Sequence, residues 1–246
     1  MIRIQKFLAN HALMSRRAAD QAVRDSRVKI NDQKAVPGQV VESGDEVFLD
    51  GKQIVPRKIE SRLMLYHKPV GRICSMAESE MPRSIWQDFP KLGAGKWISV
   101  GRLDINSSGL MLITTDGELA NRLMHPSSNI ERVYKVRAFG KVTDDMLEKM
   151  KTGVRLDDGL ACFKKVKLLE SSNKDKLNVW FEVTVTSGRY RMVRRVFESL
   201  GLTVNRLIRL RYGPLILPAE LPLGRCISLS EEDVSALNQY IKRFIK

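Results

Sequence analysis

The order of strand-like and helix-like segments along residues 61–246 constrains the fold more than any other feature of the chain. Apolar runs typical of strands often follow one another directly, and amphipathic helices interrupt them at irregular intervals. A doubly wound parallel sheet requires regular alternation of strand and helix, so this order favours an α+β domain with a mixed, largely antiparallel sheet flanked by helices. Strands are expected at residues 63–67, 97–102, 110–114, 133–139, 164–168, 179–186, 204–209 and 225–229, and helices at residues 117–124, 143–151, 190–200 and 230–245.

The first sixty residues have the pattern of a small separate unit. Apolar residues recur there at helical spacing, and Ser15 is placed to cap the second of two helices. Short strands follow, with a tight turn expected at Asp50-Gly51. Residues 56–62 are polar and charged with no apolar period, which is typical of a linker. We therefore expect a module over residues 1–60 and a second domain over residues 61–246.

Positive charge is concentrated in two windows of the sequence. The chain has 42 Lys and Arg against 28 Asp and Glu, a formal net charge of +14. Residues 1–29 contribute +5 and residues 187–213 contribute +6, and the second window contains seven arginines and no lysine. Arginine suits bidentate phosphate contacts and stacking on bases. This distribution favours a nucleic-acid-binding protein over one whose basic surface serves solubility alone.

Other features of the composition argue against a membrane or secreted protein. The longest stretch free of Asp, Glu, Lys and Arg is the eleven residues 105–115, whereas a membrane span needs about 20. The start of the chain has no apolar core of a secretory signal. The cysteines are three in number and far apart, which favours neither a disulfide framework nor a zinc site. We expect a cytoplasmic protein without a bound metal.

One polar loop stands out between two apolar strands. Residues 97–101 form an apolar run, residues 102–109 form a polar loop rich in short side chains, and the chain then becomes apolar again. This places Asp104 at a sheet edge, where loops on rigid strands often carry reactive groups. The alternative is an ordinary turn in which Asp104 and Asn106 bind their own backbone. The pattern alone leaves both interpretations open.

The polar loop and several later segments resemble motifs of one family, the pseudouridine synthases of the RsuA branch. The order of the motifs is the same as in that family, and the N-terminal unit resembles the α-L RNA-binding module of a small-subunit ribosomal protein. Together the resemblance covers nearly the whole chain. The matching segments are Gly101–Leu110, Thr114–Leu119, His125–Ser127, Glu131–Tyr134 and Gly188–Arg195.

The resemblance implies an isomerisation in which the glycosidic C–N bond of a uridine is broken, the base turns, and a C–C bond is formed. Substrate and product are isomers, so the implied reaction needs no cofactor and no metal. Asp104 is the implied essential carboxylate, either as a nucleophile or as a base acting on the sugar. Arg194 is implied as the cation that keeps this carboxylate charged, and Tyr134 as the ring that stacks on the target base.

The implied partner is ribosomal RNA. Residues 121–125 and 207–213 look closest to members of the branch that act on large-subunit (23S) rRNA, and Arg191-Met192 replaces the His-Gln of several other relatives. Arg102 is similar to an arginine that relatives insert into the vacated base stack. The substrate is either naked rRNA or an assembly intermediate, and a monomer is expected. Further RNA contacts are expected from Arg3, Arg16, Arg17, Arg24, Lys29, Arg189, Arg195 and Arg209.

Two other functions are compatible with the same sequence. The chain could act on small-subunit rRNA, as RsuA itself does, or it could be a non-catalytic rRNA-binding assembly factor. A hydrolase that uses Asp157 and Asp158 as paired carboxylates is disfavoured, because adjacent strand residues face opposite ways. Asp157-Asp158-Gly159 instead has the pattern of a hairpin turn.

Overall fold

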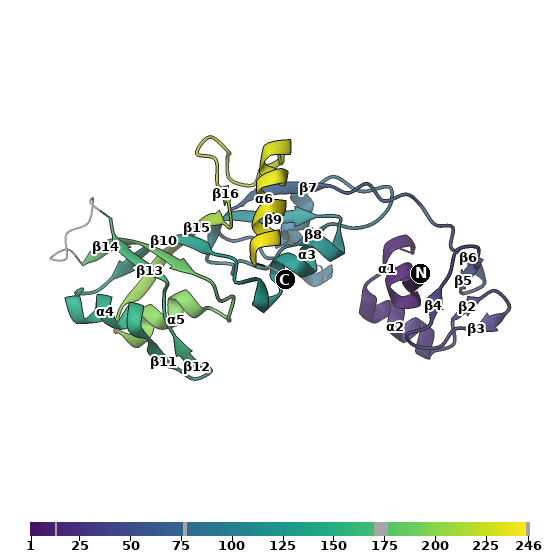
Figure 1. Cartoon of the computed structure of the whole chain (residues 1–246), viewed down its shortest axis with the longest axis horizontal. Helices are drawn as coiled ribbons and strands as arrows, with labels where there is room; N and C mark the ends of the chain where they lie inside the picture. Colours follow the sequence, from purple (N-terminus) through teal and green to yellow (C-terminus); the bar gives the residue numbers. More distant parts are fainter. Residues whose placement is uncertain (13, 76–77, 170–176, 245–246) are drawn as a thin grey trace. The chain divides into compact units, whose positions relative to one another are not determined.

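The computed structural model describes residues 1–12, 14–75, 78–169 and 177–244 and divides into two compact units (Figure 1). The first unit comprises Met1–Ser61 together with Pro90–Trp97, and the second comprises Arg62–Phe89 with Ile98–Lys246. The segment Pro90–Trp97 was not expected in the first unit. The two ends of this segment are joined by a hydrogen bond in which the Trp97 indole Nε1–H donates to the carbonyl oxygen of Pro90 at 2.9 Å.

The first unit packs two helices beside short antiparallel strands. Ser15 Oγ accepts a hydrogen bond from the Ala18 N–H at 3.0 Å, which confirms the predicted cap of the second helix. The Asp50-Gly51 turn is also confirmed, with positive φ at both residues. Apolar residues from both helices and four strands form its core. The elements are β1 (Ile2–Arg3), α1 (Ile4–His11), α2 (Arg16–Arg24), β2 (Val28–Ile30), β3 (Gln33–Lys34), β4 (Val40–Val41), β5 (Val47–Leu49) and β6 (Lys52–Gln53).

The second unit is built on a nine-stranded sheet whose main path is β13-β14-β10-β15-β9-β7-β17. Every strand pair is antiparallel except β9 with β15, so the expected mixed, largely antiparallel sheet is confirmed. The strand expected at residues 97–102 is reduced to two residues, because the chain leaves the sheet early to form the polar loop. The strands are β7 (Leu63–Lys68), β8 (Ile98–Ser99), β9 (Ser108–Thr114), β10 (Arg132–Phe139), β13 (Lys165–Leu168), β14 (Asn178–Val185), β15 (Thr203–Tyr212), β16 (Leu215–Ile216) and β17 (Cys226–Ser228).

Helices and one hairpin cover a single face of the sheet around β10, β13 and β14 (Figure 1). Buried residues alternate along these strands with longer polar ones, as expected for a sheet with one covered face. The hairpin turns at Asp157-Asp158, so the predicted turn there is confirmed. These covering elements are α4 (Asp144–Thr152), β11 (Val154–Leu156), β12 (Gly159–Ala161) and α5 (Met192–Ser199).

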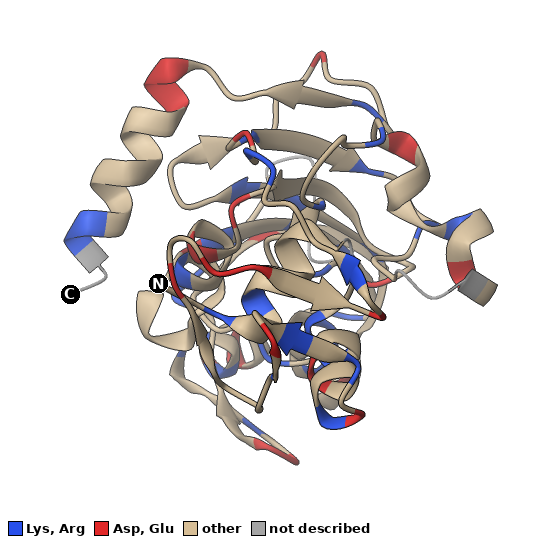
Figure 2. Ribbon diagram, turned by 90° about the vertical axis from the view of Figure 1, so that its right-hand side faces the viewer, with Lys and Arg blue, Asp and Glu red and all other residues tan. Residues whose placement is uncertain are grey.

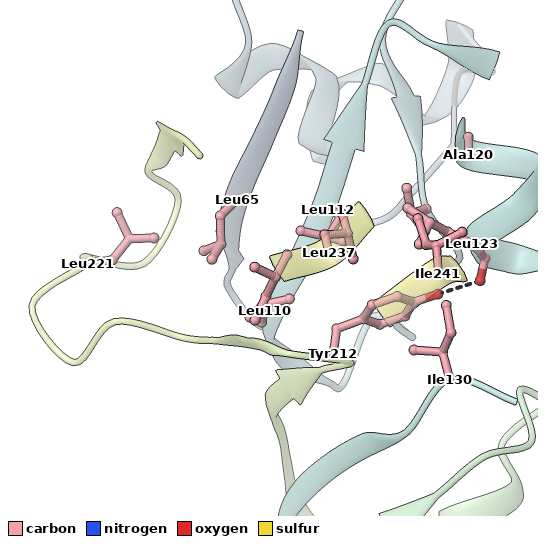
Figure 3. Packing of buried hydrophobic residues seen from close by; sticks show 12 residues of the cluster. Leu65, Leu110, Leu112, Ala120, Leu123, Ile130, Tyr212, Leu221, Leu237 and Ile241 are labelled. Atoms are coloured by element: carbon pink, nitrogen blue, oxygen red, sulfur yellow. Dashed lines mark hydrogen bonds between the residues drawn. The ribbon is translucent and has the colours of Figure 1, made fainter. Parts of the chain in front are cut away.

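The other half of the second unit contains a large apolar core (Figure 3). Leu237 and Ile241 of α6 pack with Leu123 of α3 and with residues of β9, and the Tyr212 hydroxyl donates to the Leu123 carbonyl oxygen at 2.8 Å. Helix α6 begins with acidic and ends with basic side chains, which complements its dipole (Figure 2). No helix among the described residues is both long and apolar enough to span a membrane. The remaining helical elements are η1 (Glu78–Arg83), η2 (Ile85–Asp88), α3 (Gly117–Met124), η3 (Pro126–Ser128) and α6 (Glu231–Phe244).

Candidate active site

A cavity of about 440 Å³ lies where the polar loop, β10, α5 and β15 meet. Asp104 and Tyr134 both line it, together with Val193 and Leu207. Its size falls within the usual range for small-molecule sites, about 300–1,000 Å³. The sheet brings these residues together because β9, which follows the loop, pairs in parallel with β15. The loop that carries Asp104 therefore ends beside the strands that supply the other wall.

The backbone around Asp104 is held by a buried lysine that the sequence analysis did not single out. Lys68 ends β7, has no solvent-exposed surface, and its Nζ donates to the carbonyl oxygens of Pro69, Asp104 and Ser107 at 2.9–3.0 Å. These three carbonyls satisfy all three ammonium protons. The one available signal was a lysine between an apolar strand and a proline. Lys68 positions the loop and does not touch the cavity.

Burial lowers the pKa of Lys68 to about 8. Raising the pH is therefore predicted to lower the activity and to raise the contribution of Lys68 to stability. As the pH rises through 8, the ammonium loses a proton and with it one of its three hydrogen bonds to carbonyl oxygens, which loosens the loop, so the single-turnover rate should fall. The unfolded chain binds more protons between pH 8 and the ordinary value of 10.5, so the contribution of Lys68 to stability rises over that range. Rates and thermal unfolding measured from pH 7 to 10 check both signs. Lys68→Arg, which stays charged, should lose the alkaline fall in rate, and a flat wild-type profile would refute the assignment.

Arg194 does not form the ion pair with Asp104 that the resemblance implied. Its Nη2 donates to the Asn106 carbonyl oxygen at 2.7 Å and its Nη1 to that of Val204 at 2.8 Å. The side chain is buried and lines a separate cavity of about 800 Å³, which Asp104 does not line. In the described part of the chain Arg194 has no carboxylate within 4.0 Å. Arg194 therefore braces the backbone of the loop instead of facing the carboxylate directly.

Arg191 is the residue that meets Asp104. Its Nη1 lies 3.8 Å from Asp104 Oδ2, and its Nη2 lies 3.6 Å from Glu198 Oε1. Arg191 has a left-handed backbone (φ 47°, ψ 27°) and precedes α5, which begins at Met192 and not at residue 190 as expected. This conformation turns its side chain into the cavity, which it lines. The guanidinium next to the carboxylate is thus supplied three residues earlier than predicted.

We expect Arg191→Gly to reduce activity without a matching loss of stability. A left-handed backbone destabilises the folded protein by about 1–2 kcal/mol for a residue other than glycine, and glycine removes this strain. Glycine also gives the unfolded chain more conformational freedom, which lowers stability by about 0.5–1 kcal/mol, so the two effects largely cancel. The lost ion pair is partly exposed, so we assign it about 1 kcal/mol, which corresponds to a roughly fivefold to tenfold slower single turnover. Urea unfolding and rates on saturating RNA check the two effects. Arg191→Lys should recover most of the rate, and equal activity of the glycine variant and wild type would contradict the role.

Aromatic and basic side chains form the wall opposite the loop. Tyr134 on β10 is buried with its side chain at the cavity, as a base-stacking residue requires. The Tyr212 ring has the Arg132 guanidinium carbon 5.1 Å and that of Arg209 5.4 Å from its centroid. Arg209 is only 2% exposed and its Nε donates to the Leu110 carbonyl oxygen at 2.7 Å. Arg209 ties β15 to β9 and also lines the cavity, so the predicted contact of Arg209 with RNA stays a prediction for the nucleotide that enters the cavity.

The other arginines expected to contact RNA differ in how far their charge is compensated. Arg102 is exposed at the edge of the cavity. Arg189 also lines it, but its Nε lies 3.6 Å from Asp158 Oδ2 and its Nη1 donates to the Asp158 carbonyl oxygen at 3.2 Å. Arg195 instead makes two hydrogen bonds to the Asp158 carboxylate, at 2.6 and 3.0 Å, and this raises its pKa. Arg102 remains placed for RNA, whereas Arg189 and Arg195 both contact Asp158 in the turn of the β11–β12 hairpin, Arg195 more closely.

In the first unit, the basic residues expected to contact RNA are all exposed. Arg24 pairs with Asp20 at 2.9 Å. The other four have no carboxylate within 4.0 Å in the described part of the chain, so their charge is available to a polyanion. The five residues are Arg3, Arg16, Arg17, Arg24 and Lys29. In the same described residues, no group of three or more His, Cys, Asp or Glu is placed to hold a metal ion.

Comparison with known proteins agrees with this fold. Residues 62–199 match the family described as RNA pseudouridylate synthase, and residues 2–47 match the S4 domain. The chain therefore belongs to the RNA pseudouridylate synthase family, and it is an enzyme of the pseudouridine synthase type. The N-terminal S4 domain identifies the first unit as an RNA-binding module of the kind expected.

Several curated relatives are similar over nearly all of this chain, and each is named ribosomal large subunit pseudouridine synthase B. The relative from Buchnera aphidicola is 42% identical over 96% of this chain and 96% of its own length. Those from Pseudomonas aeruginosa and Shigella flexneri are each 41% identical, over 97% and 98% of this chain and over 62% and 83% of their own lengths. A solved pseudouridylate synthase, 30% identical, superimposes over 96% of this chain and all of its own with a TM-score of 0.66.

Proposed function

We propose that this chain converts a uridine of large-subunit ribosomal RNA to pseudouridine, with Asp104 as the essential carboxylate. The observation that supports this most directly is the cavity in which Asp104 faces the Arg191 guanidinium at 3.8 Å, on the fold of this family. In the reaction the bond from C1′ to N1 breaks, the uracil turns, and a bond from C1′ to C5 forms. The proton lost from C5 is balanced by the proton gained at N1, so nothing else is consumed.

Each cavity residue has a proposed part in this reaction. The uridine must leave its helix before its ribose can be reached, and Tyr134 stacks on the extruded base. Asp104 acts on the ribose, and the Arg191 guanidinium, 3.8 Å from its carboxylate, orients it toward the cavity. Lys68 and Arg194 hold the backbone of the loop so that the carboxylate stays in place. Arg102 enters the space that the base has left.

The choice of RNA follows from the relatives. Those described above are named for the large ribosomal subunit and match nearly the whole of this chain, so we propose large-subunit rRNA, free or within an assembling particle. The exposed basic residues of the first unit would bind phosphates and position the RNA without reading its sequence. We further propose that the protein acts as a monomer in the cytoplasm, where ribosomes assemble.

Mapping pseudouridine in ribosomal RNA from cells that lack this protein tests the proposal. One missing site in the large-subunit rRNA is expected, and the wild-type chain but not Asp104→Asn should restore it. A missing site in the small-subunit rRNA would transfer the assignment to that subunit. An unchanged map of both RNAs would contradict an rRNA-modifying function.

A further inference from the structure

The face of the sheet around β10, β13, β14 and β15 that no described helix of the second unit covers carries a cluster of cations that the catalytic site does not use. Along β10, Tyr134 and Lys135 point to opposite faces, so residues that share the face of Lys135 lie away from the cavity. Helices α4 and α5 and the β11–β12 hairpin cover the other face (Figure 1). We call the cluster the basic sheet face. Its members are the four cations Lys135, Arg137, Lys167 and Arg206, together with the Trp180 ring that lies among them.

The strand register places these cations directly beside one another. Arg137 lies opposite Arg206 on β15 and opposite Trp180 on β14. Lys135 and Lys167 both lie opposite Glu182, which is the one acidic residue in this register. Like charges in directly opposed positions destabilise a sheet. The basic sheet face therefore has four cations to one carboxylate, with two arginines facing each other.

Among the described residues, no carboxylate forms an ion pair with any of these four cations, and Glu182 offsets only part of their charge. None has a carboxylate within 4.0 Å, although elsewhere in this unit cations are commonly paired. Lys164 and Arg211, for example, both bind Glu131 at 2.7–2.8 Å. Lys167 and Arg206 are exposed, and Lys135 and Arg137 are half-buried. A solvent-accessible cluster of cations without ion pairs has a positive potential that attracts a polyanion.

Trp180 holds two of the cations in place without cancelling their charge. Lys135 Nζ lies 4.8 Å and the Arg137 guanidinium carbon 5.9 Å from the centre of the Trp180 ring system. Arg137 Nε also donates to Asn205 Oδ1 at 2.9 Å. A ring and an amide restrict these long side chains as a carboxylate would, yet the net charge stays positive. Restricting the side chains in advance lowers the entropy cost of binding.

We propose that the basic sheet face binds the phosphate backbone of the substrate RNA outside the nucleotide that enters the cavity. The identity of the polyanion as RNA rests on the proposed function, whereas the surface itself rests on charge and geometry. Phosphate contacts of this kind position RNA without reading its sequence. Within the second unit, one RNA molecule would then be held both by the cavity and by the basic sheet face.

The test uses the full chain with Lys135→Gln and Arg137→Gln combined, and purified, deproteinised large-subunit rRNA as the probe. Loss of two phosphate contacts should reduce the slope of log Kd against log salt by about 1.4–1.8 and weaken binding on the order of tenfold at physiological salt. The matched control is Lys149→Gln with Lys151→Gln on α4, which removes the same charge from exposed, paired positions. The control should keep the wild-type slope, and the thermal unfolding of both variants should match the wild type.

A third variant predicts a change of opposite sign. Glu182→Gln removes the single acid of the basic sheet face, so it should tighten binding, whereas a purely structural role of Glu182 would not. Equal slopes and affinities for the double variant and its control would overturn the proposal, and would instead favour an acidic protein partner for this face. If wild-type protein forms no pseudouridine while the double variant still loses RNA affinity, the proposed reaction fails and the binding surface stands.

Discussion

Asp104→Asn is expected to abolish pseudouridine formation, with a single-turnover rate at least about 10³-fold below wild type. Asparagine has nearly the same shape as aspartate but can neither attack the sugar nor remove a proton from it. The bonds that hold the loop in place use the backbone carbonyl of Asp104 and not its side chain, so they survive the change. Folding and RNA affinity should therefore stay close to wild type.

The measurement is single-turnover conversion of saturating rRNA, with binding and thermal unfolding followed in parallel. Asp157→Asn is the matched control, because it makes the same chemical change at an exposed turn outside the cavity. The control should retain full activity. Conversion by the Asp104 variant within tenfold of wild type would remove Asp104 from its assigned role and the proposed mechanism with it.

Among glycine-to-alanine substitutions in the second unit, Gly109→Ala should lower the free energy of unfolding the most. Gly109 has φ of 110° and pairs with Arg209 in the parallel contact between β9 and β15. A Cβ at this position would lie 2.3 Å from the Arg209 carbonyl oxygen and 2.5 Å from its backbone nitrogen. Backbone atoms cannot move aside as a flexible side chain can, so β9 and β15 must separate. We expect a loss of at least about 3 kcal/mol in the free energy of unfolding.

Urea unfolding of Gly109→Ala beside Gly201→Ala separates the clash from the backbone strain. Gly201 also has positive φ, at 76°, but a Cβ there meets nothing within 4 Å. Its alanine variant should lose only about 1–2 kcal/mol, the usual cost of a left-handed residue. If both variants lose the same free energy of unfolding, the close approach of β9 and β15 is not the reason that position 109 requires glycine.

Local patterns along the chain were enough to predict most of the elements and the position of the polar loop. The cap at Ser15 and the turns at Asp50-Gly51 and Asp157-Asp158 depend on a few neighbouring residues, and all three are confirmed. The alternation of apolar residues likewise predicted β10 and β14 to within about one residue. Such features depend on interactions within a few positions, which a sequence displays directly.

The electrostatic details of the site were not accessible in this way. Arg194 was expected to face Asp104 on a helix starting near residue 190, but the left-handed backbone of Arg191 delays that helix and sends a different guanidinium to the carboxylate. Lys68 went unnoticed because lysine is almost never fully buried unless it is paired, and its partners are carbonyls of a loop that is distant in sequence. Both outcomes depend on contacts between segments about 35 to 90 positions apart.

The parallel contact between β9 and β15 has a consequence for the timing of activity during synthesis. This contact joins Gly109 to Arg209. The ribosome therefore adds the β15 wall of the cavity about one hundred residues after the loop that carries Asp104 (209 − 109). A chain still growing on its ribosome completes the first unit before β15 is made, since the last segment of that unit is Pro90–Trp97. The RNA-binding first unit can thus fold before the cavity is complete. Modification of RNA has to follow the emergence of β15 from the ribosome.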